Sequence, residues 1–567
     1  MADLAKIQPD TDSEALTAPA PGKFGNPRPI MREIGPPAPS ADAAEFGVAL
    51  VRGPILSTHA AFNNEATPAI GLAFISGYLK KHGYNPVIVD AVGEGLNVTW
   101  QPEGIDGYQC QGTTIENTVA MIPDHVRVIG FSTMFSGEWP VHRQLIEAVR
   151  ARFPDAYLVA GGEHATALPE YSLRDCPALD AVAVGEGEHV FYEIVETVRE
   201  GGDPSDLIGV CTLAEDGTYR PSAGLTRIRD VDNIPWPHWQ EGYLEKFWSA
   251  GKSFGIQTER DVPMMISRGC PFQCTFCSSA QMWTTRYLLR DIDDVIAEMK
   301  HYISEYNATS IQLYDLTAIT KKQWTVELCQ RMLDEGIDIK WSLPSGTRSE
   351  ALDEETLDLL KRTGCTYLCY APESGSPRTL ELIKKRVSLD RLTDSVMAAR
   401  RVGLTLRTNL IIGFPGETRS DIFRTVWFGL RMAASGVDEA SINIYSAYPG
   451  TEIFSDLRKQ GMIDLNDRYF LGLTSLNSDY TSFKPLTYNE TMGRRELAVY
   501  RIGFMLTNYI ISYLFYPKRI LRTLRNVFYS REASTVFEHR LKDALARRRG
   551  KAHGSDNGSE SRDENLR

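Results

Sequence analysis

Two long stretches of this chain alternate short apolar, β-branched runs with helical patterns, and no other feature constrains its fold as much. The first stretch covers about residues 44–210. Its strand candidates lie at 47–51, 85–91, 126–133, 156–162 and 180–188, with helical patterns such as 71–83 and 141–153 between them. Strands joined by helices predict right-handed βαβ crossovers, and therefore an α/β domain with a doubly wound parallel sheet.

The second stretch, about residues 259–460, repeats this alternation. Its strand candidates lie at 263–267, 310–314, 340–344, 366–371, 406–413 and 441–446, and helical patterns such as 293–306 and 354–364 separate them. Six β/α units predict an open, partial (β/α)6 barrel, whose site would lie at the carboxyl ends of its strands.

The remaining segments lack this alternation. Residues 1–43 and 553–567 are polar or Pro-rich without periodicity, which predicts a disordered lead-in and a disordered tail. We interpret residues 211–258, which contain Pro-Trp-Pro, as a connector, and residues 461–552 as a basic, helical C-terminal region.

Composition excludes several classes of protein. The 567 residues carry a formal net charge of −12, which argues against general nucleic-acid binding through phosphates. The first residues lack the apolar core of a signal peptide, and no apolar run reaches the ~20 residues of a membrane-spanning helix. We therefore expect a cytoplasmic protein whose nine cysteines are thiols, so that a cluster of them indicates metal binding or catalysis.

One loop directly after the first strand of the second stretch concentrates the chemistry. The segment SRGCPFQCTFCSS spaces Cys270, Cys274 and Cys277 as C-x3-C-x2-C. Three soft thiolates on one short loop suit an iron–sulfur cluster or zinc. A structural zinc site needs a fourth ligand, which only a distant His could supply here. On a four-iron cluster, three ligands would leave one iron open to a substrate or cofactor.

This loop resembles the signature of the radical S-adenosylmethionine (SAM) superfamily, and the resemblance covers about residues 259–450. It implies that the three cysteines bind a [4Fe–4S] cluster whose open iron chelates S-adenosyl-L-methionine. Reduction of the cluster then cleaves SAM to a 5′-deoxyadenosyl radical, which removes a hydrogen atom from the substrate. Phe276 matches the aromatic residue that packs near adenine, and a flavodoxin- or ferredoxin-type protein is the implied reductant.

The same resemblance implies further SAM contacts. Glu373, in APESGS, would accept hydrogen bonds from the ribose hydroxyls, although a helix-capping role is the alternative. The backbone near Ile412, in NLIIGFPGET, would stack on adenine. Ser345 and Arg348 follow the KWSLP strand as candidate SAM contacts. Asp315 stands where many members carry Gly-Gly-Glu, so it is a candidate partner of the SAM amine.

The first stretch resembles the cobalamin-binding domain that precedes many radical SAM domains. The resemblance rests on TPAIGLAFISGYLKKHGYNPVIVD, GFST, VAGGEHAT and AVGEGE. Small residues at strand ends would let a flat corrin ring approach the backbone. The residues expected to line it are Ser132, Thr133, Gly161, Gly162, Gly185, Glu186 and Gly187. The alternative is a Rossmann-like domain with no ligand or with a nucleotide.

The usual motif for a histidine below cobalt is incomplete. Cobalamin domains with such a ligand carry Asp-x-His-x-x-Gly after the first strand, whereas this chain has STHAAF, with His59 but neither Asp nor Gly. A histidine without its orienting carboxylate is a weaker ligand. We therefore expect His59 to be an ordinary loop residue, and His164 to lie near the edge of the ring.

The C-terminal region is the most basic part of the chain. Residues 494–551 contain fourteen Lys or Arg and four Asp or Glu, a local charge of +10 beside many aromatic and apolar residues. Such a stretch can make a peripheral contact with an anionic membrane. The interpretation that we favour is a helical cap over the barrel opening.

Together these features predict a cobalamin-dependent radical SAM enzyme that methylates an unactivated carbon of a small molecule, lipid or tetrapyrrole. A methyl group on cobalt needs an acceptor, and a deoxyadenosyl radical can create one from an unactivated C–H bond. One alternative is a non-methylating enzyme that resembles anaerobic magnesium-protoporphyrin IX monomethyl ester cyclase. A second alternative is a non-catalytic cobalamin sensor.

Overall fold

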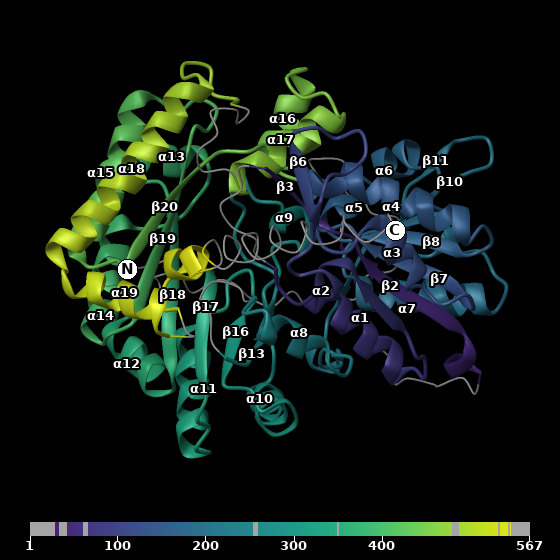
Figure 1. Cartoon of the computed structure of the whole chain (residues 1–567), viewed down its shortest axis with the longest axis horizontal. Helices are drawn as coiled ribbons and strands as arrows, with labels where there is room; N and C mark the ends of the chain where they lie inside the picture. The colour runs from purple at the N-terminus through teal and green to yellow at the C-terminus, as the bar shows by residue number, and fades with distance from the viewer. Residues whose placement is uncertain are drawn as a thin grey trace, which may run out of the picture.

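The computed structural model describes residues 29–32, 42–59, 66–252, 259–348, 351–478, 487–530, 533–542 and 545. Two sheets dominate this structure, one in the N-terminal domain and one in the barrel that follows it (Figure 1). The predicted tail at 553–567 lies outside the described residues.

A seven-stranded sheet forms the N-terminal domain, in the order β11-β10-β9-β8-β7-β2-β4. Its parallel strands are β2 (Gly47–Arg52), β4 (Val87–Asp90), β7 (Val126–Ser132), β8 (Tyr157–Gly161) and β9 (Ala181–Ala183). The strand order reverses at β2, because the chain adds β4 on one side of it and β7 on the other. In such sheets ligands bind at this reversal, beyond the carboxyl ends of the strands.

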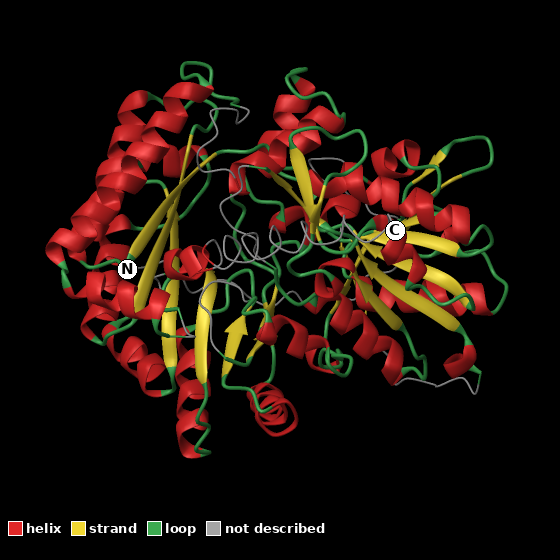
Figure 2. Ribbon diagram, viewed as in Figure 1, coloured by secondary structure: helices red, strands yellow, loops and turns green. Residues whose placement is uncertain are grey.

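Helices cover both faces of this sheet (Figure 2). Leu50 of β2 packs in one buried cluster with α1 (Ile70–Lys81) and α7 (Gly187–Arg199). The next residue, Val51, packs on the opposite face with α4 (Trp139–Arg152). Alternate side chains of a strand point to opposite faces, so a strand covered on both sides is a continuous apolar run. The shorter helices of this domain are α2 (Ala91–Glu94), α3 (Ile115–Ala120), α5 (Glu163–Ala167) and α6 (Pro169–Asp175).

Part of the predicted connector belongs to this domain. β10 (Val210–Leu213) pairs antiparallel with β9, and β11 (Tyr219–Arg220) pairs antiparallel with β10. β12 (Leu225–Ile228) pairs in parallel with β1 (Pro29–Arg32), inside the predicted lead-in. The expectation of disorder is therefore wrong at β1. Its order comes from a partner almost 200 residues away, which local composition does not reveal.

The second sheet contains six parallel strands in sequence order, as the alternation predicts. They are β13 (Asp261–Met264), β16 (Ser310–Leu313), β17 (Lys340–Thr347), β18 (Cys365–Glu373), β19 (Thr405–Ile412) and β20 (Glu439–Ile444). The helices α10 (Ile292–Tyr306), α11 (Lys322–Asp334), α12 (Glu354–Arg362), α14 (Leu389–Arg401) and α15 (Arg419–Ser435) connect them. β13 and β20 are the two ends of the order, so the barrel is open.

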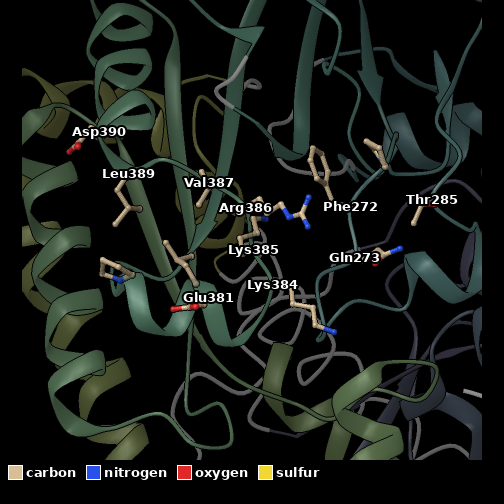
Figure 3. Close-up of a pocket in the computed structure, with 13 residues that line it drawn as sticks. Phe272, Gln273, Thr285, Glu381, Lys384, Lys385, Arg386, Val387, Leu389 and Asp390 are labelled. Atoms are coloured by element: carbon tan, nitrogen blue, oxygen red, sulfur yellow. The ribbon is translucent and has the colours of Figure 1, made fainter. Parts of the chain in front are cut away.

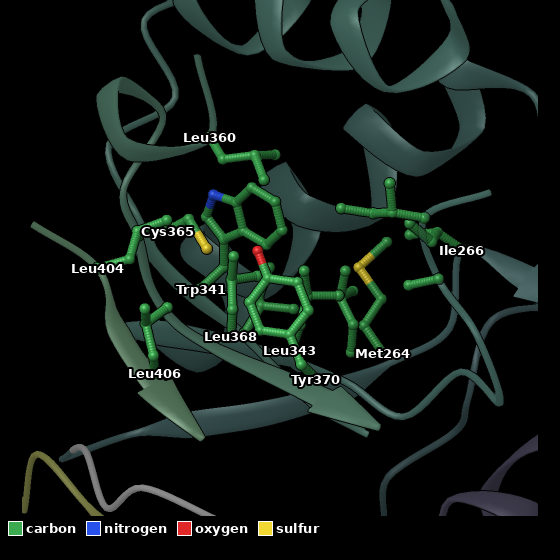
Figure 4. Close-up of a cluster of buried hydrophobic side chains, with 14 of the residues drawn as sticks. Met264, Ile266, Trp341, Leu343, Leu360, Cys365, Leu368, Tyr370, Leu404 and Leu406 are labelled. Carbon is green, nitrogen blue, oxygen red and sulfur yellow. The ribbon is translucent and has the colours of Figure 1, made fainter. Parts of the chain in front are cut away.

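Apolar side chains from strands and helices fill this barrel wall (Figure 4). Leu343 of β17 and Leu368 of β18 are buried beside Leu360 of α12, and Trp341 donates its indole N–H to the carbonyl of Thr363. Cys365 is fully buried in the same cluster and Cys369 in a smaller one nearby, as expected for core thiols. The core thus fixes the strands whose carboxyl ends carry the site.

Shorter elements join these layers. They are β3 (Ile55–Thr58), β5 (Thr99–Trp100), β6 (Tyr108–Gln111), α8 (Tyr243–Ser249), β14 (Ser267–Arg268), α9 (Ser279–Met282), β15 (Leu288–Leu289), α13 (Pro377–Leu382), α16 (Glu452–Lys459) and the 3-10 turns at 43–45, 136–138, 204–206 and 231–233.

The described part of the C-terminal region is helical, and its longest helix does not cap the barrel opening. α17 (Asp467–Ser478) packs against the N-terminal domain, whereas α18 (Arg494–Phe515) runs beside α15 and β20 (Figure 1). A Cβ atom at Gly429 of α15 would lie 2.5 Å from Phe504, so this glycine lets the two helices pack closely. α18 therefore covers the free edge strand of the barrel, and the expected cap is wrong for this helix.

The described segment around Val536 lies at the opposite end of the strands from the site. α19 (Lys518–Phe528) follows α18, and Val536 packs against Tyr367 at the start of β18. The N–H of Val536 also donates to Glu439, the first residue of β20, at 3.2 Å. By length and composition alone, α18 is long and apolar enough to cross a membrane, with 33% of its apolar window buried. The sequence analysis expected no apolar run of the ~20 residues that a membrane-spanning helix needs, whereas this helix of 22 residues meets that criterion.

Candidate functional site

A buried carboxylate fixes the start of the cysteine loop. Asp315 follows β16, is 0% exposed, and accepts hydrogen bonds from the backbone N–H groups of Ile266 (3.1 Å) and Ser267 (2.6 Å). Burial raises the pKa of Asp315 to about 6. Because its oxygens hold the chain that leads to Cys270, Asp315 is a positioning group here rather than the expected partner of the SAM amine.

The three cysteines of the loop differ from the other six. Cys270, Cys274 and Cys277 are half-buried, whereas the remaining cysteines are buried. Burial raises the pKa of each of the three thiols, to about 11 for Cys274, and the nearby Cys277 raises the pKa of the other two further. Such thiols ionise only when a bound cation stabilises the thiolate. Accessible, neighbouring thiols on one loop fit three corners of an iron–sulfur cluster.

A site for a single metal ion needs ligands that converge on one point. Among the residues that the structure describes, no three His, Cys, Asp or Glu side chains form a group that could hold one metal ion.

Aromatic rings enclose the far side of the loop. Phe276 is half-buried, and its ring lies 5.6 Å from that of Phe414, which in turn lies 4.9 Å from the ring of Tyr445. The side chain of Ile412 is buried in the barrel core, and its carbonyl accepts the N–H of Tyr445 at 2.8 Å. The whole residue is 0% exposed, so the contact between adenine and the backbone near Ile412 that the resemblance implies stays a prediction.

The other residues expected to contact SAM lie at the other side of the cysteine loop. Glu373 ends β18 with a left-handed backbone (φ 67°), and its carboxylate lies 3.1 Å from Lys385 Nζ. A non-glycine residue in this region is strained, which is common at functional sites. The guanidinium of Arg348 lies 3.5 Å from the centre of the Phe272 ring, inside the cysteine loop. Ser345 lies half-buried where the register between β17 and β18 shifts.

A cavity of about 1100 Å³ opens against this edge (Figure 3). Residues 271–273 of the cysteine loop line one side, and residues 377–390 line the other. Lys384, Lys385 and Arg386 make its wall basic, although Glu381 and Asp390 also line it. Sequence analysis missed this basic segment, whose three consecutive cations were the available signal.

The strand ends of the N-terminal domain are shaped by backbone rather than by side chains. Thr133 is buried and donates its hydroxyl to the carbonyl of Gly161 at 2.9 Å. Gly162 has φ 108°, and a Cβ atom there would lie 3.0 Å from the carbonyl oxygen of Thr133. Only glycine accommodates this close approach. Ser132, Gly161 and Gly162 are half-buried at the edge where the corrin was expected.

The AVGEGE segment does not present all of its expected residues. Glu186 is 2% exposed, lies 3.3 Å from Arg227 Nε, and accepts the N–H of Ile228 at 2.6 Å. Its carboxylate therefore joins β12 to the domain instead of lining a ligand, which corrects that expectation. Gly185 bridges to Thr226, and Gly187 lies beside Ile75, so both glycines pack against protein on at least one side.

Two apolar residues at this edge escaped the sequence analysis. Met134 and Phe135 follow β7 directly and are 42% and 55% exposed. Large apolar side chains exposed at a strand end suit the face of a flat ligand. Their position immediately after Ser132-Thr133 was the signal.

His164 has a packing role in this domain. His164 is fully buried, its ring is stacked on Trp139 at 4.5 Å, and burial lowers its pKa to about 3. This differs from the expected place at the edge of a ring. His59 lies exposed in a turn after β3.

The cysteine loop is tied directly to the strand ends of the N-terminal domain. Ser278, next to Cys277, donates its hydroxyl to the carboxylate of Glu163, which follows Gly162. Arg268, two residues before Cys270, forms a buried ion pair with Glu188 at 2.7 Å. The carboxyl ends of the two sheets therefore face one another.

Comparisons with known proteins find a match for the barrel and another for the N-terminal domain. Residues 264–428 match the family model of the radical SAM superfamily, and residues 64–195 match that of the B12 binding domain. An uncharacterized methyltransferase of Pyrococcus horikoshii is 27% identical over 81% of this chain and 90% of its own length. Anaerobic magnesium-protoporphyrin IX monomethyl ester cyclase of Rubrivivax gelatinosus is 26% identical over 69% of this chain and 66% of its own.

A solved structure shares the whole architecture. The radical SAM methyltransferase TsrM of Kitasatospora setae, with cobalamin and a [4Fe–4S] cluster bound, aligns with a TM-score of 0.59. The alignment covers 89% of this chain and 99% of that one at 14% identity, so it shows a common fold.

Proposed function

Since the chain is a radical SAM enzyme with a B12-binding domain, we propose that it methylates an unactivated carbon of a small molecule. One observation carries the proposal. The loop with Cys270, Cys274 and Cys277 is held against the strand ends of the N-terminal domain through Ser278 and Glu163. A substrate between the two edges would reach both sets of cofactor-binding residues at once.

The cysteine loop and its neighbours have distinct tasks in this proposal. Cys270, Cys274 and Cys277 hold the [4Fe–4S] cluster, and Asp315 fixes the chain that leads to them. When bound, the cluster, SAM and cobalamin supply the radical and methyl-transfer chemistry, while the protein positions the reactants and excludes water.

SAM would lie among the residues that surround the loop. The Phe276 and Phe414 rings close an apolar side near the backbone of Ile412. Glu373, held by Lys385, would accept hydrogen bonds from the ribose hydroxyls, and Ser345 and Arg348 would contact SAM from β17.

Cobalamin would lie across the facing edge. Ser132, Gly161 and Gly162 supply a surface of small residues, and Met134 and Phe135 add exposed apolar side chains. Thr133, Gly185 and Gly187 support this surface from behind. His164 is buried away from this surface, so the described residues would hold the corrin mainly by shape and apolar contact.

Partners follow from the same assignment. A cytoplasmic enzyme of this class needs an electron, and we infer a flavodoxin- or ferredoxin-type donor. The Rubrivivax relative is a cyclase for a magnesium porphyrin, and its similarity keeps a tetrapyrrole among the proposed substrate classes, beside a lipid. A peripheral membrane contact through the basic C-terminal region would give access to such apolar substrates.

Product analysis under anaerobic conditions tests the reaction. The full chain is reconstituted with iron, sulfide and hydroxocobalamin, reduced with dithionite, and mixed with SAM and a metabolite extract. Methylation predicts both 5′-deoxyadenosine and S-adenosylhomocysteine, together with a metabolite heavier by one CH2 unit. If 5′-deoxyadenosine forms alone, the cyclase-type reaction replaces methylation. If neither product forms with any reductant, the enzyme assignment is contradicted.

A further inference from the structure

The outer surface of α18 carries large apolar side chains, whereas its inward face is only partly apolar. Toward the barrel the helix buries Leu497, Ala498 and Phe504 together with the polar residues Arg501, Asn508 and Ser512. Toward the outside it presents apolar residues that are 62–73% exposed, namely Val499, Leu506, Ile510 and Leu514. These positions are spaced by seven, four and four residues, about two turns and then one turn each, so they form one stripe along the helix.

α19 turns polar side chains toward the protein and apolar side chains outward. None of its residues is buried. Its polar side is bound to the protein: Arg519 Nη1 donates to the carbonyl of Val437 at 3.0 Å, and Arg522 lies 2.8 Å from Asp438. Its apolar side faces outward through Leu521, Leu524 and Phe528, which are 70%, 48% and 57% exposed.

Charge restricts what this surface can meet. No Asp or Glu occurs from residue 497 to residue 530, although the whole chain has a net charge of −12. Lys518 and Arg525 lie exposed on α19, and Arg494 and Arg495 lie exposed at the start of α18. A partner for this surface is therefore apolar and negatively charged.

We propose that α18 and α19 dock the enzyme on the surface of an anionic lipid bilayer. We call the docking surface the outward face, defined by Leu506, Ile510, Leu514, Leu521, Leu524 and Phe528 with Lys518 and Arg525. Apolar side chains enter the boundary between headgroups and acyl chains, and the cations meet lipid phosphates. This specifies the surface and the lipid for the membrane contact proposed above, and it does not depend on the reaction assigned to the enzyme.

The packing of α18 favours a helix that lies on the bilayer rather than one that crosses it. Its polar inward side chains stay against the barrel, and Tyr516, directly after it, donates its hydroxyl to the carbonyl of Ala434 at 2.9 Å. A second copy of the chain is a poorer occupant. A two-fold interface brings the same patch of both subunits together, and here it would oppose like positive charges.

Vesicle flotation with the anaerobically reconstituted full chain tests the proposal. We expect binding to phosphatidylcholine vesicles that contain phosphatidylglycerol, weak binding to pure phosphatidylcholine, and a decline in binding as salt rises. Each Lys or Arg contributes about a fivefold increase in partitioning, so the double variant Lys518→Gln/Arg525→Gln should bind about 25-fold more weakly. Leu514→Glu/Leu521→Glu should abolish binding.

The control places one of these two negative charges on an exposed apolar residue elsewhere. Val98→Glu, 49% exposed in the N-terminal domain, should bind vesicles like the unaltered protein. Iron content and hydroxocobalamin binding are measured in every sample and should not change, which separates this proposal from the proposed function. Equal binding to neutral and anionic vesicles would overturn the proposal. So would absence of vesicle binding, or a dimer in light scattering that Leu514→Glu/Leu521→Glu dissociates.

Discussion

The two facing strand edges of this protein carry function in different ways. At the barrel edge it resides in the identity of side chains, three cysteines on one loop that a buried Asp315 positions. At the N-terminal edge it resides in the shape of the backbone, where Gly162 lies against the carbonyl of Thr133. Side-chain chemistry is visible in a sequence through spacing, whereas backbone shape depends on what packs behind it.

This difference predicts that substitutions at the two edges have separable effects. The largest should follow Cys274→Ala, which removes one of three iron ligands. We expect loss of more than nine-tenths of the iron–sulfur absorbance and of SAM cleavage, with unchanged hydroxocobalamin binding. Cys329→Ala, a buried thiol in α11, is the control and should retain iron. Loss of cobalamin binding in Cys274→Ala would show that the two edges are not separable.

The sequence predicted the elements that follow from local pattern. Both parallel sheets and the position of the cysteine loop after β13 agree with the alternation of strands and helices. It could not reveal long-range partners. In the sequence Glu186 resembles a ligand residue, because its ion-pair partner Arg227 lies forty-one positions later. The segment of β1 has the composition of a disordered segment, and only its pairing with the distant β12 makes it a strand.

The C-terminal region shows the same limit for surfaces. Its helices and their charge were predictable from composition. Which side of α18 faces the barrel depends on the free edge of β20 and on Gly429, so a cap over the opening was the wrong expectation for this helix.

Breaking the connection between the edges should have the next largest effect. Glu188→Ala leaves the buried Arg268, two residues before Cys270, without its salt-bridge partner and with only the coulombic attraction of Glu186. We expect a loss of about 3–5 kcal/mol in the free energy of unfolding, measured with urea. The exposed pair of Arg401 and Glu354 is the control, since Glu354→Ala should cost less than about 1 kcal/mol. Equal losses in both variants would contradict a buried connection.

Backbone shape at the N-terminal edge is tested by Gly162→Val. The positive φ and the contact with Thr133 should cost about 1–3 kcal/mol of strain, lowering hydroxocobalamin affinity about tenfold while iron content is unchanged. Gly201→Ala, also at positive φ but with open space around it, should bind cobalamin normally. If Gly162→Val binds cobalamin as tightly as the unaltered protein, the corrin does not lie at this edge.

The smallest expected effect is a pH response of opposite sign at the two edges. Burial lowers the pKa of His164 to about 3, so below pH 6.5 the unfolded chain binds the extra proton and stability falls. Burial raises the pKa of Asp315 to about 6, so stability falls instead as the pH rises from about 4 to 6.

Urea unfolding at pH 5.5 and 7.5 measures this difference. Relative to His164→Gln, the unaltered protein should lose about 1.4 kcal/mol at the lower pH, one unit below the ordinary histidine pKa. Relative to Asp315→Asn, it should gain stability as the pH falls below 6. The same sign for both residues would contradict their assigned environments.

Electron paramagnetic resonance of the reduced, oxygen-free protein tests the central claim most directly, that three thiols of one loop hold a cluster with one corner open to SAM. The account predicts a four-iron signal whose shape changes when SAM is added. A missing signal, or one that SAM leaves unaltered, would contradict it.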